Sequence, residues 1–241
     1  MISASKKFIG EFLGTFLLCY IGCGGCVLTS STPQMGPILF VFLIIGLASG
    51  FGPISGAHFN PAVSLIMLLT NKMTIVEFVY YLCAQFTGAF SGFYFLYLLL
   101  LSTTNGKVTN LACNGYGSLS QYHISASVAC LVECIITCFF TFVILVASNN
   151  PAVGAKAPFI VGSTLGAIAF FSAGLTGGSM NPARSLAPAI IMGGEPLRQV
   201  WVFMIFPMVG AFIAAYLYMF LLGGEKKDEK KENYIEMKDK E

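Results

Sequence analysis

The sequence predicts an all-α membrane protein with six transmembrane helices, two re-entrant half-helices and an inverted internal repeat. Three observations predict it: an apolar composition, six long apolar stretches, and a ten-residue motif that occurs once in each half. Of 241 residues, 56% are hydrophobic and only 10% are charged, with a mean hydropathy of +0.79. Soluble domains carry about 25% charged residues, so this chain cannot cover a water-soluble surface. Its net charge of +2 gives no indication of a nucleic-acid partner.

Six apolar stretches approach the roughly 20 residues that a helix needs to cross a bilayer. An even number of spans places both termini on one side of the membrane. Most lysines outside the spans fall on that side, and the positive-inside rule therefore predicts cytoplasmic termini. The expected spans are 8–28, 36–53, 75–101, 124–147, 157–175 and 200–222; the cytoplasmic cations are Lys6, Lys7, Lys72, Lys156 and six tail lysines, against Lys107 and Arg198 outside.

Beyond the last span, residues 223–241 form a charged tail. Its last 17 residues combine six lysines with seven acids and almost no apolar side chains. Such a segment cannot bury enough apolar surface to fold by itself. We therefore expect a disordered, solvated cytoplasmic tail.

The two halves of the chain repeat each other. The stretches "SGAHFNPAVS" (55–64) and "TGGSMNPARS" (176–185) lie 121 residues apart. Farther upstream, Glu11 and Glu133 lie 122 residues apart, and each is followed by a threonine four residues later. Two features with nearly the same period indicate an internal duplication. Because each half holds an odd number of spans, the second half enters the membrane with inverted orientation.

Each Asn-Pro-Ala motif precedes a short apolar helix pattern, "PAVSLIMLLT" (61–70) or "PARSLAPAII" (182–191). Ten residues make about 15 Å of helix, which is half of the ~30 Å hydrocarbon core. Neither piece can span the bilayer alone. Because the repeat is inverted, the two pieces enter from opposite faces and meet tip to tip.

The motif letters suit the start of a helix at mid-membrane. Asparagine is a favoured N-cap, because its side-chain oxygen accepts a backbone N–H of the first turn. Proline suits the next position, where a backbone N–H would have no partner. The two tips then present positive dipole ends and amide donors to the membrane centre. The predicted pore motifs are Asn60, Pro61 and Ala62 in the first half and Asn181, Pro182 and Ala183 in the second.

With both motifs, and with "GAHFNPAV", "AQFTGA" (84–89) and "FPMVGA" (206–211), the chain resembles the major intrinsic protein family, the aquaporins and aquaglyceroporins. The resemblance implies an aquaporin-like homotetramer in which each monomer has its own pore. It implies a channel domain over 8–222, with repeats at about 8–101 and 124–222, after a cytoplasmic N-terminus of residues 1–7.

Arg184 breaks the symmetry of the motifs, because Val63 stands at the matching place in the first half. The resemblance implies that Arg184 belongs to an outer selectivity filter with Phe40, Ala169 and Gly178. Strict water channels of the family have histidine where this chain has Ala169, so the filter is expected to be wide. The signals are mixed: Met204 replaces a tryptophan common in water channels, yet Ser185 and Ala189 stand where glycerol channels usually have aspartate and a basic residue.

Two acids lie deep within predicted spans, Glu11 and Glu133. Intramembrane carboxylates are costly and usually functional, and a proton relay is one hypothesis for them. The resemblance implies a structural role instead, in which each carboxylate binds the backbone of a re-entrant loop. His58 is interpreted as a third loop support, with a pH switch as the alternative.

These observations predict a passive membrane channel that conducts water, together with small neutral solutes such as glycerol or urea, and excludes protons and ions. The alternative within the family is a strict water channel. An ion-coupled secondary transporter is the alternative from another class, since such proteins also use inverted repeats and broken helices. An enzyme is not expected, because no nucleophile–base pair or metal-ligand cluster occurs in the sequence. We expect no catalytic residue, cofactor, metal or nucleic-acid partner.

Overall fold

The computed structural model describes residues 2–32, 34–104 and 106–222. The tail predicted to be disordered, 223–241, lies outside these residues. Among the described residues, six helical segments are long and apolar enough to cross a membrane, which confirms the predicted all-α fold with six spans. Their bounds are Ala4–Leu28, Met35–Ser55, Ile75–Thr103, Ala126–Asn149, Gly154–Ser172 and Gly194–Leu222.

The first span contains three helical segments in succession. It begins as the α-helix α1 (Ala4–Leu17), continues as one stretch of π-helix, and ends as a short α-helix. The elements in chain order are α1, the π-helix η1 (Leu18–Cys23), α2 (Gly24–Leu28), α3 (Met35–Ser55), α4 (Pro61–Leu69), α5 (Ile75–Thr103), the 3-10 turn η2 (Gly117–Leu119), α6 (Ala126–Asn149), the 3-10 turn η3 (Gly154–Lys156), α7 (Ala157–Ser172), α8 (Pro182–Met192) and α9 (Gly194–Leu222).

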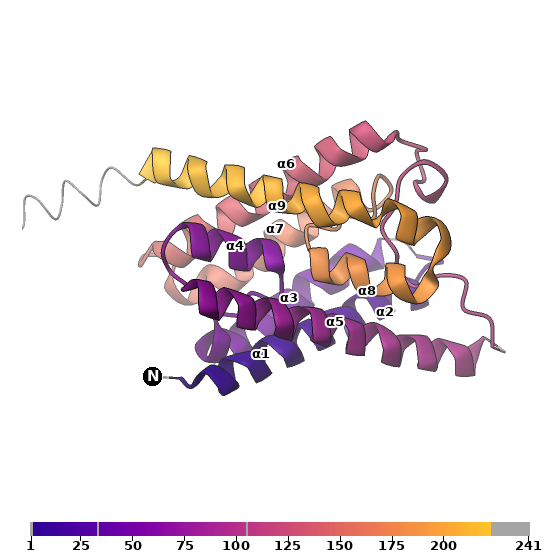
Figure 1. Ribbon diagram of the computed structural model, residues 1–241, viewed down its shortest axis with the longest axis horizontal. Helices are drawn as coiled ribbons and strands as arrows, with labels where there is room; N and C mark the ends of the chain where they lie inside the picture. Colours follow the sequence, from indigo (N-terminus) through magenta and orange to yellow (C-terminus); the bar gives the residue numbers. More distant parts are fainter. Residues whose placement is uncertain (1, 33, 105, 223–241) are drawn as a thin grey trace, which may run out of the picture.

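The short helices α4 and α8 lie end to end in the interior of the bundle (Figure 1). Asn60 caps α4 by accepting the N–H of Ala62 at 2.9 Å, and Asn181 caps α8 by accepting the N–H of Ala183 at 3.1 Å. Each helix has proline at its first position, as the motif predicts. In Figure 1 the N-terminus and the end of α9 lie at the same end of the bundle, as six spans require.

The long helices pair in the same way in both halves, α1 with α5 and α6 with α9. The closest approaches lie at two glycines 122 residues apart. A Cβ added at Gly88 of α5 would lie 2.4 Å from the carbonyl oxygen of Phe12 in α1. A Cβ at Gly210 of α9 would lie 2.3 Å from the carbonyl oxygen of Cys134 in α6. Small residues therefore let backbones pack closely where lipid supplies no hydrophobic driving force.

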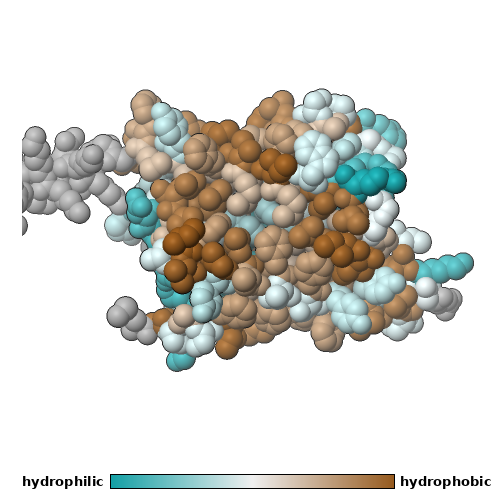
Figure 2. Space-filling model, viewed as in Figure 1, coloured by the Kyte–Doolittle hydropathy of each residue, from teal (hydrophilic) through white to brown (hydrophobic). Residues whose placement is uncertain are grey.

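The outer surface is apolar and the interior contains many polar side chains. Figure 2 shows hydrophobic residues across the middle of one face, with the most hydrophilic residues toward its two ends. Large apolar side chains such as Phe42 and Phe220 are 68% and 73% exposed, whereas Glu11 and Glu133 are fully buried. This distribution suits a chain whose flanks contact lipid, and the protein is an integral, multi-pass membrane protein.

Candidate functional site

The two re-entrant loops have the same backbone conformation. Each contains three positive φ angles in a span of four residues, and the matching positions lie 121 residues apart. A side chain in this left-handed region is unfavourable, so the surroundings must hold the loops in place. The pairs are Gly56 (φ 85°) and Gly177 (79°), Ala57 (54°) and Gly178 (54°), and Phe59 (51°) and Met180 (52°).

The buried carboxylate of Glu11 holds the first loop. Its oxygens accept the backbone N–H groups of His58 at 2.9 Å and Phe59 at 2.7 Å. They also accept the Ser55 hydroxyl at 2.7 Å and the Gln85 amide at 2.8 Å. Four donors compensate the burial of this charge, and the contacts agree with the structural hypothesis for Glu11.

Glu133 holds the second loop in the same way with one donor fewer. Its carboxylate accepts the Thr176 hydroxyl at 2.6 Å and the backbone N–H groups of Ser179 and Met180, each at 3.0 Å. Neither Glu11 nor Glu133 lines either of the two cavities described below. With both carboxylates bonded to loop donors, the structure offers no support for the proton-relay hypothesis.

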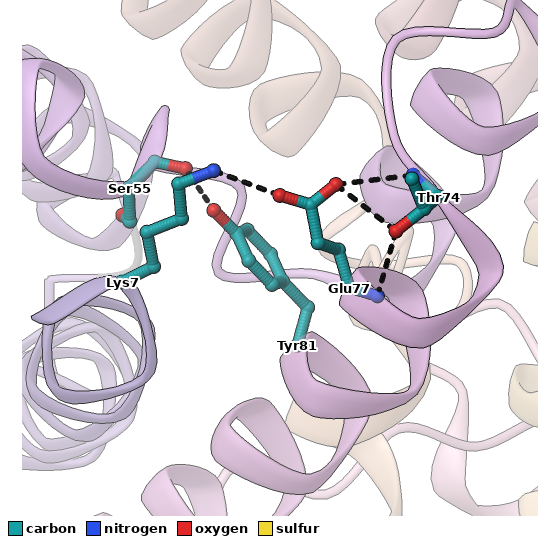
Figure 3. Close-up of polar contacts among 5 residues, drawn as sticks. All are labelled: Lys7, Ser55, Thr74, Glu77 and Tyr81. Carbon is teal, nitrogen blue, oxygen red and sulfur yellow. Dashed lines mark hydrogen bonds and ion pairs between the residues drawn. The ribbon is translucent and has the colours of Figure 1, made fainter. Parts of the chain in front are cut away.

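A second polar cluster ties the first loop to the ends of α1 and α5 (Figure 3). Tyr81 donates its hydroxyl to the carbonyl oxygen of Ser55 at 2.6 Å. One turn earlier in α5, Glu77 binds Lys7 of α1 at 2.8 Å and forms a capping box with Thr74. The aromatic rings of His58 and Tyr81 have centroids 4.9 Å apart. The start of the first loop is thus bonded to α5, and α5 is in turn bonded to α1 through Glu77 and Lys7.

At the centre, each asparagine bonds to the opposite loop. Asn60 donates its side-chain amide to the carbonyl oxygen of Met180, and Asn181 donates to the carbonyl oxygen of Phe59, both at 2.8 Å. A primary amide has two N–H groups, so one on each asparagine is left for a molecule in the pore. The sequence indicates the caps, but it gives no sign of these exchanged bonds.

A cavity of about 410 Å³ extends along the interior, and both asparagines line it. The four residues predicted as a filter lie on α3, α7, the second loop and α8, and all of them line this cavity. A second cavity, of about 190 Å³, lies on the other side of the first loop. Among the described residues, His58 alone lines both cavities. The lining of the first cavity includes Phe40, Ala169, Gly178, Arg184, Asn60 and Asn181, and the lining of the second includes Val63.

Two glycines shape the predicted filter. A Cβ added at Gly178 would lie 2.4 Å from the hydroxyl oxygen of Ser172, at a position where φ is already 54°. Ala57 has the same φ at the matching position, so the contact with Ser172 is what favours glycine at 178, and the missing side chain also leaves the cavity open. In the π-helical turn η1, a Cβ at Gly22 would lie 2.9 Å from the ring of Phe40. Sequence reasoning missed Gly22, because an apolar span gives no indication of a π-helical turn.

Arg184 is 7% exposed and donates through Nη1 to the side-chain oxygen of Asn114 at 2.7 Å. Asn114 lies in the connection between α5 and α6 and is itself buried. Neither Asn114 nor Gln85 was identified as a site residue from the sequence. Both act through long-range contacts, which no local pattern indicates. Among the described residues, no three His, Cys, Asp or Glu side chains are grouped to hold a metal.

A family model described as "Major intrinsic protein" matches residues 1–218. The chain belongs to the major intrinsic protein family. Aquaporin Z of Brucella melitensis is 35% identical, covering 90% of this chain and 98% of the relative. Aquaporin Z of Rhodopseudomonas palustris is 34% identical, covering 90% and 93%. The X-ray structure of the aquaglyceroporin from Plasmodium falciparum aligns with a TM-score of 0.78 at 28% identity, covering 91% of this chain and 97% of that one.

Family membership decides between the classes considered from the sequence. The protein is a membrane channel of the aquaporin type for water or small solutes, and it is not an enzyme. The hypothesis of an ion-coupled transporter is therefore set aside.

Proposed function

We propose that this channel conducts water in single file and also admits small neutral solutes such as glycerol or urea, while it excludes protons and ions. One observation carries the proposal. Phe40, Ala169, Gly178 and Arg184 come from four different elements and line a single cavity together with Asn60 and Asn181. A solute that crosses the outer part of this cavity meets all four residues.

The chemistry of these four positions suits a small polyol or an amide. Phe40 offers an apolar wall to the carbon atoms of the solute, and Arg184 offers N–H donors to its hydroxyl or carbonyl groups. These contacts offset part of the cost of removing the solute from water. Ala169 and Gly178 take up little space, so the opening is wider than one that contains a histidine. The structural relative from Plasmodium falciparum is named an aquaglyceroporin.

The exclusion of protons follows from the charges at the centre. The N-termini of α4 and α8 carry positive dipole ends, and Asn60 and Asn181 each have an N–H group to donate. A water molecule that accepts from both amides points its hydrogens away along the pore. That orientation interrupts a chain of hydrogen-bonded water, and the dipoles repel cations. Arg184 adds positive potential at the outer part of the cavity.

A strict water channel is the second candidate. Ser185 stands where glycerol channels usually have aspartate, and its hydroxyl is bonded to Asn114 at 2.8 Å. Ala189 takes the place of a basic residue common in those channels. The relatives at 35% and 34% identity are named Aquaporin Z rather than aquaglyceroporin. We rank this candidate second because Ala169 leaves the proposed filter, formed with Phe40, Gly178 and Arg184, without an imidazole.

We infer a homotetramer and cytoplasmic termini, with residues 8–222 forming the channel and residues 1–7 a cytoplasmic N-terminus. Exposed aromatic side chains such as Phe42 and Phe159 supply apolar surface for lipid or for neighbouring copies. Glu11, His58 and Glu133 are proposed as loop supports, on the strength of the hydrogen bonds described above.

Vesicles that contain the purified protein test the proposal. In hyperosmotic sucrose they should shrink faster than empty vesicles, with a low activation energy and no proton leak. In a glycerol or urea gradient they should then re-swell. Ala169→His should abolish re-swelling and preserve shrinkage, because an imidazole narrows the opening. Ala169→Ser adds a hydroxyl with little bulk, so it should retain more glycerol flux than Ala169→His. If the unmodified protein passes water but neither glycerol nor urea, the protein is a strict water channel.

A further inference from the structure

The connection between α5 and α6 places one buried amide beside the predicted filter. Asn114 is 3% exposed, and each end of its side chain is bonded. The oxygen Oδ1 accepts from Nη1 of Arg184 at 2.7 Å and from the Ser185 hydroxyl at 2.8 Å. The nitrogen Nδ2 donates to the carbonyl oxygen of Thr176 at 3.1 Å. This amide thus links the outer connection, the second re-entrant loop and α8.

The chemistry of the partners fixes which way the amide points. Arginine has only donors, so the atom that faces Arg184 must be the oxygen of Asn114. A backbone carbonyl is only an acceptor, so the atom that faces Thr176 must be the nitrogen. Aspartate would lack the donor for Thr176, and alanine would lack both groups. Asparagine therefore satisfies both sides at once.

The groups that bond to the Asn114 amide are themselves held by further hydrogen bonds. Thr176 donates its own hydroxyl to Glu133 at 2.6 Å, and the backbone N–H of Gly115 also bonds to the Thr176 carbonyl at 3.2 Å. Ser185 is 2.5 Å from the hydroxyl of Ser179 in the second loop. Within the described residues, the bond to Asn114 is the one hydrogen bond from the guanidinium to another side chain. The position of the guanidinium therefore depends on a single acceptor.

We propose that Asn114 is a positioning residue that sets the solute selectivity of the channel by holding the guanidinium of Arg184 against the cavity wall. The inference rests on the proposed filter role of Arg184. Without the Asn114 oxygen, a buried charged donor has no partner, which is costly. The long side chain then turns toward water in the cavity and obstructs the opening. Glycerol needs a wider opening than water, so its flux falls further.

The experiment compares osmotic water flux with glycerol flux in vesicles, first for two variants of Asn114. Asn114→Ala removes the acceptor and should lower the ratio of glycerol to water flux about tenfold, the effect of one lost hydrogen bond to a charged group. Asn114→Asp keeps an acceptor for Arg184 but loses the donor for Thr176, and should keep the ratio within about threefold. If Asn114→Ala does not assemble, Asn114→Ser takes its place, because its short side chain does not reach Arg184.

Gln199→Ala provides a matched control for loosening the same connection. Gln199 of α9 accepts the backbone N–H of Tyr116 at 2.7 Å, close to Asn114 in sequence, and it has no hydrogen bond to Arg184. This variant should lower the melting temperature and leave the flux ratio unchanged. A ratio that falls equally in Gln199→Ala and Asn114→Ala, or equally in Asn114→Asp and Asn114→Ala, would overturn the inference, since general anchoring would then explain the effect.

Arg184→Ala separates a failure of this inference from a failure of the proposed function. If Arg184→Ala passes water and glycerol in the same ratio as the unmodified protein, Arg184 is not part of the selective opening and the proposed filter is wrong. If Arg184→Ala changes the ratio but Asn114→Ala does not, the filter stands and only the positioning role of Asn114 is refuted.

Discussion

The two re-entrant loops share one backbone conformation but are supported by different parts of the molecule. The carbonyl oxygen that precedes the first loop, on Ser55, accepts from Tyr81 of α5. The equivalent carbonyl in the second half, on Thr176, accepts from Asn114 and from the N–H of Gly115. The residue equivalent to Tyr81 in α9 is Phe203, which has no hydroxyl to donate.

This difference shows where the duplicated halves have diverged. The first loop is held by side chains of the membrane helices α1 and α5. The second loop is held partly by the connection between α5 and α6, the same segment that binds Arg184. One segment therefore bonds both the second loop and Arg184, the proposed filter cation. In the first half Val63 stands at the place that matches Arg184, so no such cation has to be held there.

The largest expected effect comes from the two buried carboxylates. Each carboxylate oxygen of Glu11 accepts two hydrogen bonds. In Glu11→Gln an NH2 group, which can only donate, replaces one of these oxygens. In either orientation of the amide this NH2 group therefore faces two donors. In Glu133 one oxygen accepts only the N–H of Met180, so the NH2 group of Glu133→Gln can take the place where it faces a single donor. Glu11→Gln should therefore be the more destabilising, with each change costing about 3 kcal/mol or more of unfolding free energy. Melting temperatures in detergent measure this.

Glu195→Gln, at the surface end of α9, serves as the control for removing one carboxylate and should change the melting temperature little. Equal losses for Glu11→Gln and Glu133→Gln would show that the number of donors at each carboxylate does not set its contribution.

A smaller effect is expected where the loops differ in one methyl group. Ala57 and Gly178 share a φ of 54°, but a Cβ at 178 would lie 2.4 Å from the Ser172 hydroxyl. Gly178→Ala should cost about 1–3 kcal/mol through this contact and reduce glycerol flux. Ala57→Gly should be nearly neutral, because relief of backbone strain offsets the added flexibility of glycine.

The double variant Gly178→Ala, Ser172→Ala isolates the steric part of this effect. It should recover some of the melting temperature lost in Gly178→Ala, because the hydroxyl that blocks the new methyl group is gone. No recovery would assign the whole cost to the backbone conformation.

Tyr81 and Phe203 allow an exchange between the halves. Tyr81→Phe removes the hydrogen bond to Ser55 and should cost about 1 kcal/mol. The reverse change, Phe203→Tyr, buries a hydroxyl at a position that is 1% exposed. It should cost more, because the Thr176 carbonyl already has its donors from Asn114 and Gly115. Chemical denaturation of both variants checks the order, and a larger loss for Tyr81→Phe would contradict it.

The smallest effect is a dependence of stability on pH that we expect from His58 in the first loop. Burial lowers the pKa of His58 from its ordinary value of 6.5, against the opposing influence of Glu11. The folded protein therefore binds fewer protons than the unfolded chain, and stability is lost as pH falls below about 6.5. His58→Ser copies Ser179 of the second loop and should flatten the melting temperature between pH 7 and pH 5. An unchanged slope would mean that other groups cause the dependence.

The architecture could be predicted from the sequence because its determinants are local or periodic. The length of each apolar run, the Asn-Pro pair at the start of α4 and α8, and the spacing of Glu11 and Glu133 all reflect rules that act within one element. Helix ends were less accurate: α9 begins at Gly194 rather than near residue 200. Hydropathy detects the lipid core, but a helix continues into the polar layer, where Glu195 and Arg198 are tolerated.

The supports of the site could not be predicted in the same way. Asn114 is an asparagine followed by glycine in an irregular connection, which indicates only a turn. Its bonds to Thr176 and Arg184 depend on the path of a chain segment through space. The bonds from Asn60 and Asn181 to the opposite loops depend on how two half-helices meet, which no single element determines.

The exchange of bonds between Asn60 and Asn181 has the form of an interface between two identical subunits. Each half donates one amide to the other and receives one in return, as in a twofold-symmetric dimer. Either half alone would leave a buried amide and a buried carbonyl without partners, so neither is a complete folding unit. A chain of three spans that inserts in both orientations would satisfy these groups by pairing with a copy of itself. Because both halves belong to one chain, they need not be identical, and Arg184 can stand in one half while Val63 stands at the matching place in the other.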